Sequence, residues 1–202
     1  MTAYSPVTIG CIVEGQWDQQ AVPVVVRRVA AVVAPGTPLQ DGPVIRVGRN
    51  KLVKAGELER NVDLAARKMG GNGGILIVID ADADCPASMG PELQKRASAV
   101  RGDLPIGVVL ANREYEAWYL AAAESLQGKR GLPRTLTPPA NPEGIRDAKG
   151  WLDRHAGSHR YSETIDQLEL ARLFDLQAAR QAPSFDKCYR EIARIIAALR
   201  PA

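Results

Sequence analysis

The chain has 202 residues, 46% of them hydrophobic and 24% charged, with a formal net charge of +3. This is the composition of an ordinary soluble protein, with one domain and an appendage or two small domains, and the small charge does not by itself indicate a nucleic-acid partner. We expect a cytoplasmic protein with no membrane partner, for three reasons. The three cysteines are widely spaced, residues 1–6 show no signal-peptide pattern, and no apolar run approaches the ~20 residues of a membrane span.

Strands and helices alternate along the first 127 residues. Short apolar runs predict strands at 7–13, 44–47, 75–79 and 106–110. Helical patterns cover 18–33, with Asp18 as its N-terminal cap, and then 57–69, 91–100 and 115–126. Such alternation implies parallel βαβ units, so we predict an α/β fold with a mainly parallel four-stranded sheet flanked by helices.

The pattern changes after residue 127. A proline-rich connector precedes three segments that are helical only, at about 143–155, 163–181 and 184–199. We therefore predict an α/β domain over 1–127 and, over 128–202, the connector with a C-terminal helical subdomain packed on that domain.

The strand at 75–79 is the centre of the predicted sheet. It is a continuous apolar run after five breaker residues, as expected for a strand buried on both faces. Asp80, Asp82 and Asp84 follow it at alternate positions. Crowded carboxylates repel one another, so we expect a cation to hold them.

Acidic residues also follow two other strands. Glu14 ends the first strand, and Glu114 and Glu116 follow the fourth. Because parallel strands end at one edge of a sheet, these groups are expected to converge there. The alternative is that each acid caps the next helix, which suits Asp18, Glu92 and Glu116 but leaves three alternating aspartates unexplained. We therefore predict a metal site at this edge of the sheet.

Two segments resemble the Toprim domain of topoisomerases, primases and OLD nucleases, in which one strand ends in Glu-Gly and a later one in Asp-x-Asp. The matching segments are Val13-Glu14-Gly15 and Asp80-Ala81-Asp82, and 14–18 looks like the OLD form of the first. The whole chain is similar to a bacterial family of small, stand-alone Toprim-like proteins catalogued as a domain of unknown function. Further landmarks of that likeness are Cys85-Pro86, Glu114-Tyr115-Glu116-Ala117-Trp118, Asn141-Pro142-Glu143, Lys149 and Pro183-Ser184-Phe185.

The resemblance implies a Toprim-like, Rossmannoid sheet and a nuclease that uses Mg²⁺ or Mn²⁺ to hydrolyse DNA or RNA. Asp80 and Asp82 would be the main metal ligands, and Glu14 a ligand or the general acid–base group. Either Glu114 or Glu116 would supply a further ligand, with Asp18 and Asp84 as second choices. Lys149 would stabilise the transition state.

A basic loop at 48–56 follows the second strand. Arg49, Lys51 and Lys54 in this loop are candidates for holding a nucleic-acid backbone, and the alternative is an ordinary solvated loop. The chain has no P-loop sequence, so an ATPase partner, as in OLD-type systems for defence or repair, would be a separate subunit.

Two other functions compete with the nuclease. One is a non-catalytic binding or scaffold subunit that keeps the Toprim fold. The other is a phosphotransfer enzyme of the haloacid-dehalogenase type, in which the Asp-x-Asp pair usually follows the first strand rather than the third. The substrate's strandedness, the number of metal ions and the oligomeric state stay open.

Overall fold

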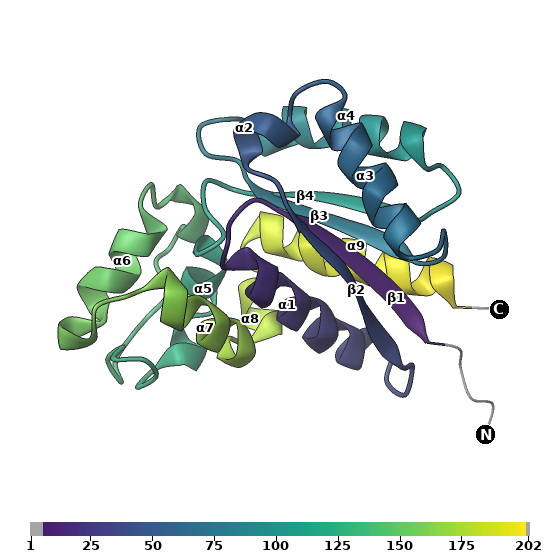
Figure 1. Cartoon of the computed structure of the whole chain (residues 1–202). Helices are drawn as coiled ribbons and strands as arrows, with labels where there is room; N and C mark the ends of the chain where they lie inside the picture. Colours follow the sequence, from purple (N-terminus) through teal and green to yellow (C-terminus); the bar gives the residue numbers. More distant parts are fainter. Residues whose placement is uncertain (1–5, 201–202) are drawn as a thin grey trace.

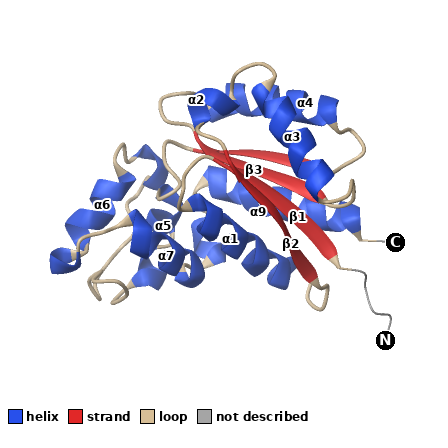
Figure 2. Ribbon diagram, in the orientation of Figure 1, coloured by secondary structure: helices blue, strands red, loops and turns tan. Residues whose placement is uncertain are grey.

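The computed structural model describes residues 6–200 and contains a four-stranded sheet in the order β2-β1-β3-β4. All three neighbouring strand pairs are parallel, which confirms the predicted α/β fold (Figure 2). The strands are β1 (Val7–Val13), β2 (Leu39–Arg46), β3 (Gly74–Asp80) and β4 (Ile106–Ala111).

Helices cover both faces of the sheet (Figure 1). The helices α1 (Asp18–Val33) and α9 (Pro183–Leu199) lie on one face, and α3 (Glu57–Lys68) and α4 (Pro86–Val100) on the other. Each face buries its own apolar cluster, with Val13, Leu76 and Val109 on the α1 and α9 side and Ile12, Ile77 and Val108 on the other. Successive strand residues alternate between the two clusters because side chains of a strand point to opposite faces.

The chain reverses its direction of winding between β1 and β3. The helix α1, which follows β1, and the helix α4, which follows β3, cover opposite faces of the sheet although β1 and β3 are neighbours. In open α/β sheets such a reversal opens a crevice beyond the carboxyl ends of the strands, where ligands bind. Glu14 directly follows β1 and Asp80 ends β3, so both lie at this crevice.

Most predicted elements of the α/β part are present, with shifted ends. The strand β2 begins at Leu39 rather than at residue 44, because edge strands tolerate a proline and the register shift opposite Gly10 accommodates the Gly42-Pro43 pair. A short helix α2 (Arg49–Leu52) interrupts the predicted loop. The helix α4 begins at Pro86 rather than at residue 91, because Pro86 also suits a first turn.

The segment after β4 is more irregular than predicted. The helices predicted at 115–126, 143–155 and 163–181 are broken into short pieces. The helix predicted at 184–199 is confirmed as α9. The pieces are α5 (Ala117–Ala121), 3₁₀ turns at Ala123–Leu126, Pro142–Gly144 and Gly157–His159, α6 (Ala148–His155), a π-turn at Glu163–Gln167, α7 (Leu168–Leu173) and α8 (Leu176–Ala179). The pieces α5 to α8 gather beyond the carboxyl ends of the strands and form a wall beside the crevice (Figure 1).

The final helix α9 returns from this wall and packs against β3 and β4. It therefore forms part of the helical layer on one face of the sheet. The domain boundary predicted at residue 127 stays a prediction. Residues 1–5, where a signal peptide would begin, lie outside the described part. Across residues 6–200 no helix combines the length and the apolar character that crossing a bilayer requires.

Candidate functional site

A small polar cavity of about 110 Å³ lies at the crevice between β1 and β3. It is bounded by the loop after β1, the end of β3, the start of α5, the helix α6 and the π-turn. The lining residues are Glu14, Gly15, Gln16, Trp17, Asp18, Asp80, Tyr115, Glu116, Lys149, Glu163 and Gln167. Five of these are carboxylic acids and one is a lysine, so the cavity concentrates negative charge.

Glu14 and Asp80 are in contact across the sheet. The backbone N–H of Asp80 donates to Oε2 of Glu14 over 3.3 Å, and the backbone N–H of Tyr115 donates to Oδ1 of Asp80 over 2.8 Å. Burial raises the pKa of Glu14, and burial together with the charges of Glu116 and Asp18 raises the pKa of Asp80 well above its usual range. The two strand ends thus bring together two acids that are 66 residues apart in sequence.

Glu116 is the most buried acid of the cavity, with an exposed fraction of 1%. Its Oε1 accepts a hydrogen bond from the hydroxyl of Tyr161 over 3.1 Å, and its Oε2 is buried without a hydrogen-bond partner. Burial raises the pKa of Glu116 to about 8. A buried carboxylate oxygen without a donor is unfavourable, so this atom indicates a missing proton or cation.

Glu14, Asp80 and Glu116 share one pattern of hydrogen bonding. One oxygen of each accepts a hydrogen bond from the protein, and the other oxygen has no protein donor within residues 6–200. Oxygen atoms of this kind are the ligands that Mg²⁺ and Mn²⁺ prefer. In the same part of the chain, however, no three or more His, Cys, Asp and Glu side chains form a group that could hold a metal ion.

The remaining charged groups of the cavity are held by other side chains. Asp18 accepts hydrogen bonds from the backbone N–H of Gly15 over 2.8 Å and from Nε2 of Gln167 over 2.6 Å. It lies in the first turn of α1 rather than at the predicted cap position, which Trp17 occupies. Lys149 forms an ion pair with Glu163. Burial lowers the pKa of Lys149, but Glu116 and Glu163 outweigh it and raise the pKa above its usual value, so the ammonium stays charged.

Asp82 and Asp84 lie apart from this cavity, with side-chain exposed fractions of 62% and 49%. Both pair with Arg49, whose Nε is 3.6 Å from Oδ2 of Asp82. The strand ends at Asp80, and a positive φ of 51° at Asp82 turns the chain there. The strand alternation, which would place Asp80 and Asp82 on the same face, therefore ends at Asp80. The role of Asp82 and Asp84 as metal ligands stays a prediction.

Glu114 points away from the cavity toward the N-terminus of α6. Its Oε2 accepts hydrogen bonds from the backbone N–H groups of Ala148 and Lys149, over 2.8 and 3.2 Å. These donors would otherwise lack a partner in the first turn of the helix. Of the two acids predicted as a further ligand, Glu116 lines the cavity and Glu114 positions α6.

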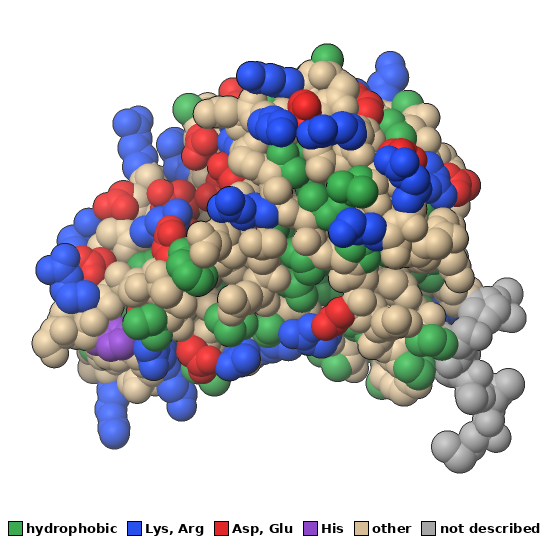
Figure 3. All heavy atoms as spheres, in the orientation of Figure 1, with side chains coloured by type: hydrophobic (Ala, Val, Ile, Leu, Met, Phe, Trp, Pro, Cys, Tyr) green, Lys and Arg blue, Asp and Glu red, His purple; other side chains and the backbone are tan. Residues whose placement is uncertain are grey.

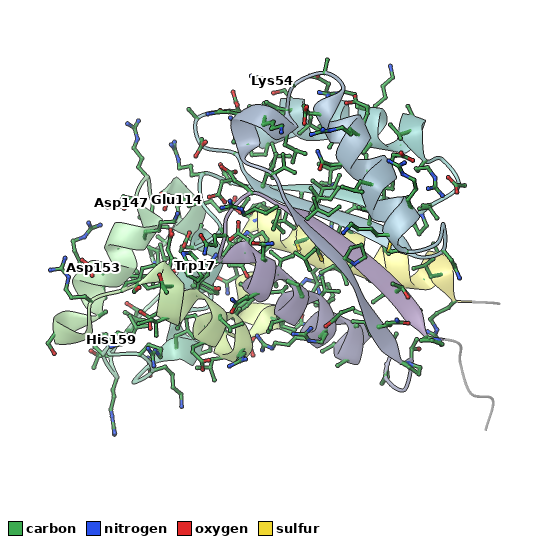
Figure 4. All side chains as sticks on the ribbon, in the orientation of Figure 1. Trp17, Lys54, Glu114, Asp147, Asp153 and His159 are labelled. Atoms are coloured by element: carbon green, nitrogen blue, oxygen red, sulfur yellow. The ribbon has the colours of Figure 1, made fainter. Side chains whose placement is uncertain are left out.

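The three basic residues predicted to bind nucleic acid have different surroundings. The Arg49 side chain is only 11% exposed, and its Nε donates to the carbonyl of Asp80 over 3.0 Å. Nζ of Lys51 is 3.8 Å from Oε2 of Glu57. Lys54 lies beside α2, far from Trp17 and Glu114 at the crevice (Figure 4). Basic side chains do gather over α2 and α3 (Figure 3), so nucleic-acid binding by Lys51 and Lys54 stays a prediction.

Sequence reasoning missed several residues that line or support the cavity, namely Tyr161, Glu163 and Gln167. All three come from the irregular segment before α7, and two belong to the π-turn. Such turns occur often at functional sites, but neither composition nor periodicity at 161–167 distinguishes this turn from a helix. Nothing in the sequence indicates that this segment returns to the ends of β1 and β3.

Comparison with known proteins gave one family match. The model of the family described as Domain of unknown function (DUF4276) matches residues 13–193 and so includes every residue of the cavity. No curated protein and no solved structure matched the chain. The likeness to Toprim domains stays a prediction, whereas the predicted kinship with a family catalogued as a domain of unknown function is confirmed. The chain belongs to the DUF4276 family.

Proposed function

We propose that this protein is a Toprim-type nuclease that hydrolyses phosphodiester bonds of DNA or RNA with Mg²⁺ or Mn²⁺ at the cavity between β1 and β3. One observation carries the proposal. Glu14, Asp80 and Glu116 each present an oxygen without a protein donor at a single cavity, located where open α/β sheets bind ligands.

The donor set fits a divalent cation in chemistry and charge. Five carboxylic acids face one ammonium, and the pKa values of Glu14, Asp80 and Glu116 are all raised, primarily by burial. A cation would relieve both the repulsion and the loss of hydration. Since these acids do not already form a ligand group within residues 6–200, binding would require their side chains to move closer together.

The chain's own groups would then serve the reaction. A bound metal ion supplies charge neutralisation at the phosphate and a more acidic water. Glu14, which lines the cavity and has a raised pKa, would accept the proton of the attacking water. The Lys149 ammonium, oriented by Glu163, would stabilise the negative charge that develops on the phosphate oxygens.

One feature supports the Toprim comparison. Glu14-Gly15 follows one strand and Asp80 ends its neighbour, so the first acid of each Toprim-like segment lies at the same edge of the sheet. The proposal extends to a role in defence or repair, by the resemblance to OLD nucleases. An ATPase that works with this protein would be a separate subunit, because the sequence has no P-loop.

A non-catalytic binding or scaffold subunit is the second candidate. It is favoured by the position of Asp82, the second acid of the Asp-x-Asp pair, which lies outside the cavity and pairs with Arg49. In that case the carboxylates would bind a cation without turnover.

The test is cleavage of supercoiled plasmid DNA and of labelled RNA by purified protein with Mn²⁺. We expect Asp80→Asn to abolish cleavage, because the amide keeps an acceptor for the Tyr115 N–H but loses the charge. Glu92→Gln, an exposed acid outside the cavity, is the matched control and should cleave like the wild type. Cleavage by Asp80→Asn at the wild-type rate would refute this cavity as the catalytic site, and Mn²⁺ binding without cleavage of either substrate would favour the scaffold.

A further inference from the structure

A second cavity, of about 290 Å³, adjoins the candidate site. It is lined by Asp82, Ala83, Arg113, Glu114 and Arg146. Three chain segments contribute to both cavities. The β3 exit contributes Asp80 to the first and Asp82 to the second, the segment after β4 contributes Glu116 and Arg113, and the entry into α6 contributes Lys149 and Arg146. The two cavities are therefore neighbours along one edge of the sheet.

The two arginines of the second cavity have no protein partner for their side chains within residues 6–200. Most other arginines in that range pair with a carboxylate, as Arg96 does with Glu59. The two acids of the second cavity are engaged elsewhere, because Asp82 faces Arg49 and Glu114 accepts the N–H groups at the start of α6. Two guanidinium groups thus remain to bind an anion.

The backbone holds Arg113 in a defined place. Its φ of 64° is left-handed, a conformation that non-glycine residues rarely adopt, and its carbonyl accepts the backbone N–H of Asp82 over 3.1 Å. Asp82 is also left-handed. A hydrogen bond therefore connects the loops after β3 and β4 at their two left-handed residues. Strained backbone of this kind is found most often at ligand sites, and it persists only where the surrounding structure holds it.

We propose that Arg113 and Arg146 form a subsite for a backbone phosphate of a nucleic-acid strand, next to the phosphodiester that the carboxylate cavity would cleave. The inference rests on the proposed function and adds a contact for a phosphate beside the one that is cleaved. Guanidinium groups suit this task because their planar N–H groups match phosphate oxygens in pairs. Arg49 pairs with Asp82 but does not line this cavity, and neither do Lys51 and Lys54, so the subsite uses other residues than the predicted basic loop.

The test is fluorescence anisotropy of labelled single-stranded DNA and RNA oligonucleotides, with EDTA present to prevent turnover, over a range of salt concentrations. The variant combines Arg113→Asn, since asparagine tolerates a left-handed φ, with Arg146→Gln. Arg134→Gln, an exposed arginine outside both cavities, is the matched control. We expect the double variant to bind roughly 10-fold more weakly, with a salt slope shallower by about 1, and the control to match the wild type.

Wild-type affinity and salt slope in the double variant would overturn the subsite, as would the absence of oligonucleotide binding by the wild type. Displacement of the oligonucleotide by inorganic phosphate at equal phosphate concentration would assign the site to a small anion and also overturn it. Asp80→Asn separates this inference from the nuclease. Cleavage that persists in Asp80→Asn refutes the catalytic site, whereas affinity that persists in the arginine variant refutes the subsite alone.

Discussion

Oε2 of Glu114 lies 2.8 Å from the backbone nitrogen of Ala148 and accepts its hydrogen bond at the first residue of α6. The same oxygen also accepts the N–H of Lys149, whose side chain lines the carboxylate cavity. Glu114 therefore fixes the start of the helix that carries Lys149, and its charge suits the positive end of the helix dipole.

The first prediction follows from this contact. Glu114→Ala should lower the free energy of unfolding by about 1–2 kcal/mol, because two N–H groups at the helix start lose their acceptor. Urea unfolding measures this, and Glu114→Gln should recover much of the loss because its amide oxygen still accepts. Mn²⁺ affinity by calorimetry should change little. A variant of unchanged stability that no longer binds Mn²⁺ would instead make Glu114 a ligand.

The second prediction concerns pH and Glu116. Its pKa in the folded protein is about 8, above the usual carboxyl value, so between roughly pH 5 and 8 the folded state holds a proton that the unfolded state has released. The stability that this proton contributes is complete at low pH and is lost as the pH rises through the folded pKa. In EDTA, we expect the melting temperature of the wild type to fall over this range.

Glu116→Gln is the matched variant, since its amide oxygen still accepts from the Tyr161 hydroxyl and carries no charge at any pH. At pH 8 this variant should have a higher melting temperature than the wild type, and its free energy of unfolding should be larger by at least about 1 kcal/mol. Both differences should shrink toward pH 5. Parallel melting curves of the two proteins from pH 5 to 8 would show that Glu116 is ionised throughout that range.

The third prediction is that Mn²⁺ stabilises the folded protein. A ligand that binds only the folded state adds about 2.7 kcal/mol at 100 times its dissociation constant. Thermal melting with Mn²⁺ should therefore give a higher midpoint, which EDTA reverses and which Asp80→Asn or Glu14→Gln removes. Glu92→Gln should respond like the wild type. A Mn²⁺ response that is equal in all four proteins would place the ion elsewhere.

The fourth prediction distinguishes the two functions open to Arg49. Its guanidinium donates to the carbonyls of Asp80 and Ala81 and pairs with Asp84, so Arg49→Gln should loosen the chain after β3 and lower stability by about 1–3 kcal/mol. Lys54→Gln, in the same basic segment, should leave stability unchanged. Urea unfolding and oligonucleotide anisotropy on both variants provide the check. Equal losses of affinity without any loss of stability would support the predicted nucleic-acid loop.

The sequence predicts that Glu14 and Asp80 lie at the same edge of the sheet. Their contact also requires β1 and β3 to be neighbours, which no residue pattern predicted. Apolar runs identify the strands, alternation with helices makes them parallel, and parallel strands place their exits at one edge. The positions of Asp82 and Glu114 were not predictable in the same way. The first depends on a left-handed residue just beyond the strand, and the second on a helix that begins 34 residues later.

The breaks in the C-terminal helices also escaped sequence reasoning. The segment predicted as one helix over 163–181 holds a π-turn, α7 and α8, with Phe174 in an extended conformation and fully buried between them. Tertiary packing of that ring, against Tyr119 and Phe185, overrides the local helical preference. Residues supplied by this segment could therefore not be assigned to the cavity in advance.

The cavity draws its walls from residues 14–18 and from residues 149–167, which are at least 131 residues apart. A ribosome that has released only the α/β part would have produced the acids of β1 and β3 without the lysine and the π-turn that enclose them. During synthesis the carboxylates therefore stay open to water until the last quarter of the polypeptide emerges. Any activity that this pocket supports therefore depends on a nearly finished chain.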